Sequence, residues 1–382
     1  MLVGIAAFHR YALVIATAGL TAIIAYEAAF TAFPTGSGAP ALLAHVEHEW
    51  VTFANLMLLL VGFELLSNQF ERSNLPDHLP RILPDNWTGG FVLLTLIFVL
   101  AAFLDNIAAA VLGAVVARHV YNGRVRVGFL AAVVAVSNAG GAGSVIGDTT
   151  TTLMWLDGVS PTTLLPAYVA AFPAFLVCGV AAAVQQHRFQ PIVAKTVADR
   201  PLQWRRIGIV AFILAVAVTV NVTVNAVGIA ELIPWLGLGL WAAIQVSSPL
   251  AAPDWRLAVP ALRGATFLVV LVAAASLMPV RSLPDPSWQS VGGLGLLSSV
   301  FDNIPLTMLA LQQGGYDWAL LAYAVGFGGS MIWFGSSAGV AVSNLYPEAR
   351  SVVRWLKEGW FIPVAFAVGF AVQMLILGWR TT

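Results

Sequence analysis

Long apolar runs separated by short polar loops dominate the chain, and most runs approach the roughly 20 residues that a helix needs to cross a bilayer. These runs predict nine crossings, near residues 10–32, 50–68, 127–156, 163–186, 206–227, 231–248, 261–280, 318–345 and 359–379. The pattern therefore predicts an all-α polytopic membrane protein.

Two further apolar runs, near 88–118 and 288–314, are interrupted by the dipeptide Asp-Asn. Asp105-Asn106 lies in the first run, and Asp302-Asn303 lies in the second, 197 residues later. The 12 residues from Ile107 to Arg118 make about 18 Å of helix, which reaches mid-membrane but does not cross. The second arm of the other run, Pro305 to Gln313, is shorter still. We therefore predict two re-entrant helical hairpins with Asp-Asn at their tips.

A glycine-rich segment follows each Asp-Asn run and is expected to break the crossing helix that contains it. The first segment contains Gly140-Gly141 and Gly147, and the second contains Gly328-Gly329 and Gly335, each 188 residues further on. Duplicated acidic elements followed by duplicated broken helices are typical of the binding site of a secondary transporter.

Basic residues predict which loops face the cytoplasm. Residues 31–49 and 157–163 contain no Lys or Arg and are expected outside, whereas 187–206 contains five and is expected inside. The basic residues are Arg72, Arg81, Arg118, Arg124 and Arg126 around the first Asp-Asn run, and Arg188, Lys195, Arg200, Arg205 and Arg206 in the later loop. The first hairpin then opens inward and the second outward, which makes the two halves inverted repeats.

This layout predicts three parts and a cytoplasmic N-terminus. The N-terminal repeat, residues 1–190, holds scaffold helices, the inward hairpin near 88–118 and the broken helix near 127–156. Residues 191–230 are the cytoplasmic linker and connecting helix. The C-terminal inverted repeat, residues 231–382, holds the outward hairpin near 288–314 and the broken helix near 318–345.

Composition agrees with a membrane protein and excludes several other classes. Hydrophobic residues make up 59% of the chain and charged residues 9%, with a formal net charge of zero. Such a chain has membrane lipids as its surroundings and no basic surface for nucleic acid. Cys178 is the single cysteine, so the chain forms no internal disulfide.

Three carboxylates at membrane depth carry the predicted chemistry: Asp105, Asp148 and Asp302. No Lys or Arg falls within 127–187, 207–255 or 282–349, so these acids have no expected cationic partner on those crossings. Carboxylates without a counter-ion hold cations or carry protons.

The alternative is that each Asp only caps a helix. A cap is worth about 1 kcal/mol, whereas an Asp at the bilayer centre costs about 2.5–3.5 kcal/mol on insertion scales. A serine would cap without that cost, which favours an ion-binding role.

A family resemblance rests on three strings: Leu104-Asp105-Asn106; the segment from Asn138-Ala139-Gly140-Gly141-Ala142-Gly143-Ser144-Val145-Ile146-Gly147-Asp148 through Thr149-Thr150-Thr151-Thr152-Leu153-Met154-Trp155; and Gly328-Gly329-Ser330 with Gly335-Ser336-Ser337-Ala338-Gly339-Val340. They resemble NhaD-type sodium/proton antiporters, of the ion transporter superfamily that includes arsenite permeases and divalent anion symporters. The anion symporters have Ser-Asn-Thr at the hairpin tips, whereas both tips here read Asp-Asn, which favours the cation branch. The resemblance implies a homodimer in a bacterial-type inner membrane.

The expected function is exchange of Na⁺, or of Li⁺ in its place, for H⁺ by alternating access. Na⁺ is expected at Asp105, Asn106, Asp148 and Thr150. The remaining expected site residues are Asn138, Ser144, Thr149, Asp302, Asn303, Ser336 and Ser337. No cofactor and no enzymatic activity are expected.

Two other functions stay open at this point. One is a sodium-coupled anion or dicarboxylate symporter, or an arsenite-type permease, on the same scaffold. The other is an intramembrane hydrolase that uses the three acids. A dense group of His45, Glu47, His48 and Glu49, in the expected external loop 31–49, is read as a metal or pH-sensing site or as a solvated membrane-interface segment.

Overall fold

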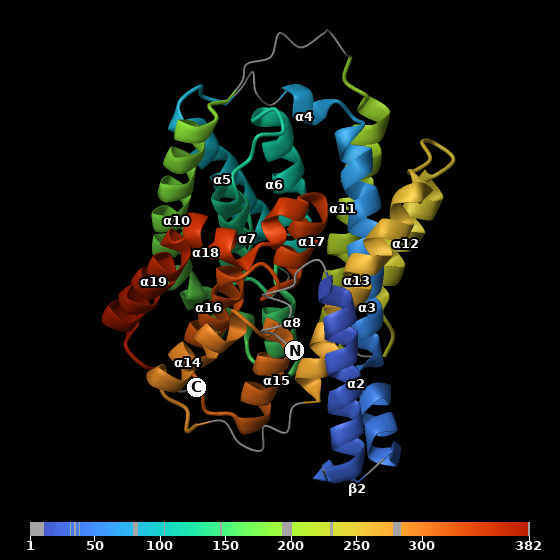
Figure 1. Ribbon diagram of the computed structural model, residues 1–382, viewed down its shortest axis with the longest axis vertical. Helices are drawn as coiled ribbons and strands as arrows, with labels where there is room; N and C mark the ends of the chain where they lie inside the picture. The colour runs from blue at the N-terminus through green and yellow to red at the C-terminus, as the bar shows by residue number, and fades with distance from the viewer. Residues whose placement is uncertain are drawn as a thin grey trace.

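The computed structural model describes residues 11–30, 32–33, 36–37, 39–78, 83–102, 104–145, 147–192, 201–229, 232–277 and 284–380. Outside these residues lie Phe103, which precedes the first motif, Ile146 of the second motif, and Arg81, Lys195 and Arg200 of the basic loops. Figure 1 shows a bundle made almost entirely of helices.

The elements of the first half are α2 (Ala12–Phe30), β1 (Ala32–Phe33), β2 (Gly36–Ser37), α3 (Ala39–Glu71), α4 (Leu75–His78), α5 (Trp87–Ala101), α6 (Asn106–Val120), α7 (Val127–Gly141), α8 (Thr149–Leu156), α9 (Pro161–Leu164), η3 (Leu165–Ala167) and α10 (Tyr168–Phe189). The elements of the second half are α11 (Trp204–Val227), α12 (Trp235–Ser247), η4 (Trp255–Leu257), α13 (Ala258–Ser276), α14 (Trp288–Ser298), α15 (Asn303–Gln313), α16 (Trp318–Gly328), η5 (Gly329–Met331), α17 (Ser337–Leu345), η6 (Pro347–Arg350), α18 (Val352–Glu358) and α19 (Phe361–Leu377). The two short strands pair antiparallel between α2 and α3.

Several helices are suited to a bilayer by length and composition. In the described residues, Glu49–Glu71, Pro161–Phe189, Trp204–Val224 and Trp255–Ala274 are long and apolar enough to cross, and α18 with α19 forms a fifth candidate bent by 59°. These helices agree with the predicted all-α, multi-pass membrane protein.

Two expected elements differ from the structure, and the two expected broken helices agree with it. The expected crossing 231–248 is the 13-residue helix α12, about 20 Å long. The expected crossings 127–156 and 318–345 are pairs of short helices, α7 with α8 and α16 with α17, as the glycine-rich breaks predict. The expected external loop 31–49 is wrong from Ala39 onward, because α3 starts there with Pro40 in its first turn, a position that tolerates proline.

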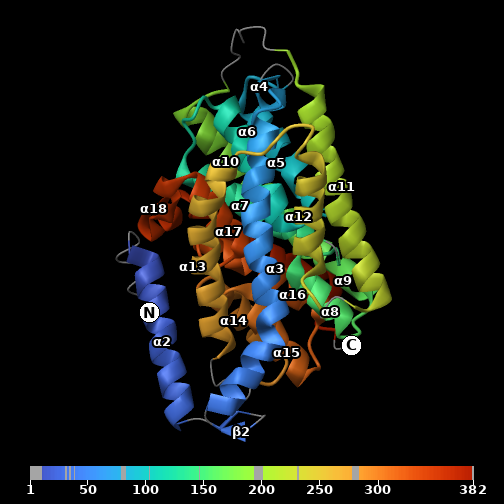
Figure 2. The same cartoon turned by 90° about the vertical axis from the view of Figure 1, so that its right-hand side faces the viewer.

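The helices form two packed groups. The first contains α2, α3, α11, α12 and α13, in which α13 packs on both α2 and α3, and α12 packs on α3 and α11. Figure 2 shows α3, α11, α12 and α13 in front of the remaining helices. The second group holds α5 to α10 and α14 to α19, and it contacts the first mainly where α6 packs on α3 and α17 on α13.

Two helix–turn–helix segments enter the second group from opposite ends of the molecule. In Figure 1, α5 and α6 lie in the upper half and α14 and α15 in the lower half. Asp105 begins α6 and Asp302 begins α15, so each Asp-Asn dipeptide lies at the turn between two short helices.

The two glycine-rich breaks are packed in the same way. A methyl group on Gly141 would lie 2.5 Å from the carbonyl oxygen of Gly147, and one on Gly329 would lie 2.7 Å from that of Gly335. Gly147 and Gly335 in turn contact backbone carbonyls at the turns that precede Asp105 and Asp302. Glycine is required at these positions because backbone meets backbone there.

Candidate functional site

All four residues that begin a helix at a tip or a break use their side chains as N-caps. Asp105 Oδ1 accepts the Ile107 N–H at 2.9 Å, and Asp302 Oδ1 accepts the Ile304 N–H at 3.1 Å. Asp148 Oδ1 caps α8 through the Thr150 N–H at 3.0 Å. At the corresponding position, Ser336 Oγ caps α17 through the Gly339 N–H at 3.2 Å.

The carboxylates differ in what their second oxygen does. Asp302 Oδ2 accepts a hydrogen bond from the Ser337 hydroxyl at 3.1 Å, so both oxygens of this buried group are satisfied. Asp148 is 1% exposed, and its Oδ2 has no hydrogen-bond partner among the described residues. Thr150 Oγ1 is also buried without such a partner. Two unsatisfied buried oxygens therefore lie at the start of α8.

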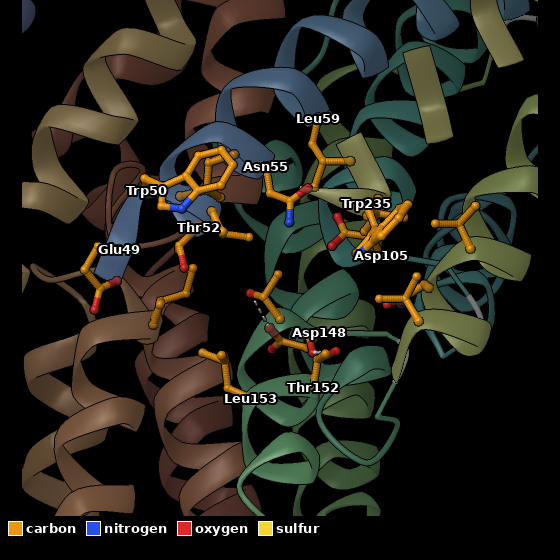
Figure 3. Close-up of a pocket in the computed structure, with 18 of the residues that line it drawn as sticks. Glu49, Trp50, Thr52, Asn55, Leu59, Asp105, Asp148, Thr152, Leu153 and Trp235 are labelled. Atoms are coloured by element: carbon orange, nitrogen blue, oxygen red, sulfur yellow. Dashed lines mark hydrogen bonds between the residues drawn. The ribbon is translucent and has the colours of Figure 1, made fainter. Parts of the chain in front are cut away.

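A cavity of about 280 Å³ lies between the two groups of helices. Figure 3 shows the side chains of Asp105 and Asp148 at this cavity, with Thr52 and Asn55 from α3 and Trp235 from α12 around it. Thr149 also lines it, whereas Asp302 does not. The structure thus brings two of the three predicted acids to the lining of one cavity, and the third is not part of that lining.

Buried amides connect the tips to the breaks. Asn106 Nδ2 donates to Asn138 Oδ1 at 2.9 Å, and Asn138 Nδ2 donates to Ser330 Oγ at 2.9 Å. This chain joins the first tip, helix α7 and the second break. At the second tip, Asn303 Nδ2 faces Asp148 Oδ1 at the long distance of 3.5 Å.

Several residues of the site were not predicted from the sequence. The hydroxyls of Thr151 and Thr152 donate to the backbone oxygens of Ser144 and Val145, at 2.5 and 2.7 Å, and so satisfy carbonyls that the break leaves free. Two aromatic side chains also bind backbone carbonyls beside the breaks. The Tyr168 hydroxyl donates to the Gly140 carbonyl, and Trp355 Nε1 donates to the Ser330 carbonyl, each at 2.9 Å.

Helix α3 forms the cavity wall opposite α8. Asn55 Oδ1 accepts the Gly237 N–H at 3.0 Å and so ties α3 to α12. Glu47 and Glu49, expected in a loop, lie on α3 and line the cavity, and Glu49 is buried. His45 Nε2 lies 3.0 Å from Ser276 Oγ of α13. Among the described residues no three His, Cys, Asp or Glu side chains converge as metal ligands, and the His48 side chain lies outside that description.

The electrostatics of the three predicted acids depend on the ion pairs that the described residues form. In the described part of the chain, ion pairs join Arg72 to Asp254 and Arg126 to Glu358, and none involves the three predicted acids. A carboxylate that is removed from water without a counter-ion is unstable as an anion, so it attracts a proton or a metal cation.

Comparison with known proteins gives relatives of one kind. No family model matches the chain. It is 28% identical over 357 residues to sodium/proton antiporter 1 of Arabidopsis thaliana, which covers 82% of this chain and 58% of that protein. It is 26% identical over 396 residues to the Na⁺/H⁺ antiporter NhaD of Vibrio parahaemolyticus, covering 88% of this chain and 92% of that protein.

The NhaD antiporter of Alkalimonas amylolytica gives a third match, 25% identical over 400 residues and covering 88% of this chain. The chain thus spans somewhat more than half of the plant protein and most of the Vibrio protein. Over most of its length this chain is therefore similar to sodium/proton antiporters of the NhaD type, the family that its motifs predict.

Proposed function

We propose that this protein exchanges Na⁺ for H⁺ across a membrane as a secondary transporter. The observation that carries the proposal is the pair of buried oxygens without partners, Asp148 Oδ2 and Thr150 Oγ1, beside a cavity lined by Asp105 and Asp148, which form no ion pair among the described residues. The names of the relatives support the same ions. They do not favour an anion symporter, a permease or a hydrolase.

The cation site in this proposal is centred on the start of α8. Asp148 and Thr150 supply the two free oxygens, and Asp105 supplies a carboxylate from the first tip, on the same cavity. Carboxylate, hydroxyl and backbone oxygens suit a hard cation such as Na⁺ or Li⁺. Asn106, through its bond to Asn138, holds the first tip in place. Ser144, Thr149, Asp302, Asn303, Ser336 and Ser337 complete the surroundings from the two breaks and the second tip.

Coupling follows from competition for the same carboxylates. Protonation of Asp148 removes the negative charge that holds Na⁺, and bound Na⁺ disfavours the proton by charge repulsion. Each transport half-cycle then carries one kind of cation. Asp105 and Asp148 act on one cavity, so their protons are assigned to the pair and not to either residue.

The proposed architecture is an inverted repeat with two re-entrant hairpins. It is supported by the 188-residue spacing of the glycines and by the matching backbone contacts at the two breaks. In Figure 1, α10 ends and α11 begins at the upper end of the molecule, whereas β2 lies at the lower end. This separation supports a cytoplasmic location for residues 187–206 and an external location for residues 31–38. The homodimer, the inner membrane and the cytoplasmic N-terminus remain part of this proposal.

Transport in proteoliposomes tests the proposal. The purified protein is reconstituted with an imposed pH gradient, and fluorescence dequenching is followed after addition of NaCl, LiCl, KCl, citrate or arsenite. We expect dequenching with NaCl, and with LiCl in its place, but not with choline citrate or choline arsenite. A response to citrate or arsenite without Na⁺, or no response to Na⁺ and Li⁺, would refute proton-coupled Na⁺ transport.

A further inference from the structure

The two halves differ at one position that faces the proposed cation site. Asn138 on α7 corresponds to Gly326 on α16, 188 residues later, by the same spacing that relates the glycine pairs. In the first half, the Asn138 side chain fills the space beside the tip and accepts the Asn106 amide. In the second half, the residue at that position has no side chain.

The carboxylate of Asp148 lies in the space that Gly326 leaves. A methyl group on Gly326 would lie 3.1 Å from Asp148 Oδ2, closer than most such contacts in proteins. Asn303, the counterpart of Asn106, accordingly faces Asp148 Oδ1 instead of a side chain at position 326. Asp148 from the first half thus takes the place that an asparagine would have in the second half.

The oxygen that faces Gly326 is the one without a partner. Asp148 Oδ1 already contacts the Thr150 N–H, whereas Oδ2 is buried and unsatisfied among the described residues. A coordination position at Oδ2 requires room for a cation, and a methyl group beside it would take that room without supplying a ligand.

We infer that Gly326 is a specificity-determining residue, which sets the size of the cation that binds at Asp148 Oδ2. The inference rests on the proposed Na⁺/H⁺ exchange. An added methyl group at position 326 narrows the site, so it excludes Na⁺ more strongly than the smaller Li⁺. One methylene in a fitted pocket typically changes discrimination by about tenfold or more.

The substitution Gly326→Ala is suited to this test. Apart from its own helix backbone, the added methyl meets only Asp148 Oδ2 within 4 Å among the described residues. Alanine also has a higher intrinsic helix propensity than glycine. Gly293→Ala on α14 is the matched control, because a methyl there meets no described atom within 4 Å.

The experiment measures the half-maximal NaCl and LiCl concentrations for dequenching, and the shift of thermal unfolding by each salt on the same preparations. We expect Gly326→Ala to raise the half-maximal NaCl concentration about tenfold and that of LiCl clearly less, with Gly293→Ala unchanged. The inference would be overturned if Gly326→Ala had the half-maximal concentrations of wild type in both salts, or if both concentrations rose by the same factor. Neither result would affect the proposed Na⁺/H⁺ exchange.

Three further outcomes are decisive. If Na⁺ stabilises wild type but wild type does not exchange protons, the proposed function fails. The role of Gly326 is then tested by the shifts of thermal unfolding with NaCl and LiCl. If wild type responds to neither salt in either assay, both proposals fail. If Gly326→Ala does not fold, Asp148→Ala/Gly326→Ala decides: a folded double variant supports the contact with Asp148, and an unfolded one contradicts it.

Discussion

The first break, residues 142–148, and the second, residues 330–336, have the same backbone packing but different side chains. Both begin after a glycine pair and end at a side chain that caps the next helix. The first ends at Asp148 and borders the cavity, whereas the second ends at Ser336 and contributes no residue to the lining of that cavity. In the second break, Trp333 is 2% exposed and stacks on Phe267 of α13 at 5.6 Å. Its counterpart in the first break is the half-buried Val145.

This difference separates what a helix break requires from what a cation site requires. The glycines and caps are needed to build a helix break, so they occur in both halves. The carboxylate and the contact with the cavity occur in one half only, so they are not needed for the break itself, which a serine caps in the other half. In the proposed function, the first break therefore carries the cation, and the second break packs on α13 through Trp333.

The largest expected effect is loss of transport on removal of the Asp148 charge. Asp148→Asn keeps the size and the capping oxygen, so folding survives, but it removes the anionic oxygen that is buried without a partner. We expect Na⁺-driven dequenching to fall to the background of empty liposomes. Ser336→Ala, in the other break, removes a cap worth about 1 kcal/mol and is expected to reduce transport only in part.

Asp157→Asn is the matched control for this prediction, because it removes a charge at the exposed far end of α8. Its transport should equal that of wild type. Wild-type rates in Asp148→Asn would show that this carboxylate is neither ligand nor proton carrier, and the two breaks would then be functionally alike.

The next effect concerns the anchoring of the second break. Trp333→Ala removes a buried ring stacked on Phe267 and is expected to cost about 3–5 kcal/mol of stability. Val145→Ala, at the corresponding position, should cost about 1 kcal/mol. Thermal unfolding in detergent measures both. Similar losses in the two variants would remove the distinction between an anchored break and an open one.

The smallest effect separates the two tips. Asn106→Ala leaves the buried Asn138 Oδ1 without its donor and should cost about 1–3 kcal/mol. Asn303→Ala removes only the 3.5 Å contact between Asn303 Nδ2 and Asp148 Oδ1. Because Asp148 Oδ1 still accepts the Thr150 N–H, the loss of stability should be below about 1 kcal/mol. The same unfolding assay measures both variants. A larger loss of stability in Asn303→Ala than in Asn106→Ala would contradict the stronger hydrogen bonding at the first tip.

Much of this contrast was predictable from local sequence. Asp-Asn within an apolar run predicted the two short-helix turns, and the repeated glycines predicted both breaks, because these features act through neighbouring residues. The carboxylates that cap the helices followed from the same motifs, as did the resemblance to NhaD-type antiporters.

The rest depends on packing between distant segments, which local patterns do not encode. The wall formed by Thr52 and Asn55 arises because α3 packs across α12, and no motif marks those positions. Asp302 does not line the cavity, and its Oδ2 instead accepts the hydroxyl of Ser337, 35 residues away in the sequence. Likewise, α13 packs on α3 and brings Ser276 to His45, in the part of α3 that was expected to be a loop.

Binding of Na⁺ at the first break is tested most directly by thermal unfolding of the purified protein in increasing NaCl, with choline chloride holding the ionic strength constant. A ligand that binds only the folded state adds about 2.7 kcal/mol of stability at a hundred times its dissociation constant. We predict that the unfolding temperature of wild type and of Asp157→Asn rises with NaCl, whereas that of Asp148→Asn does not change. An equal rise in Asp148→Asn would contradict a cation site at Asp148.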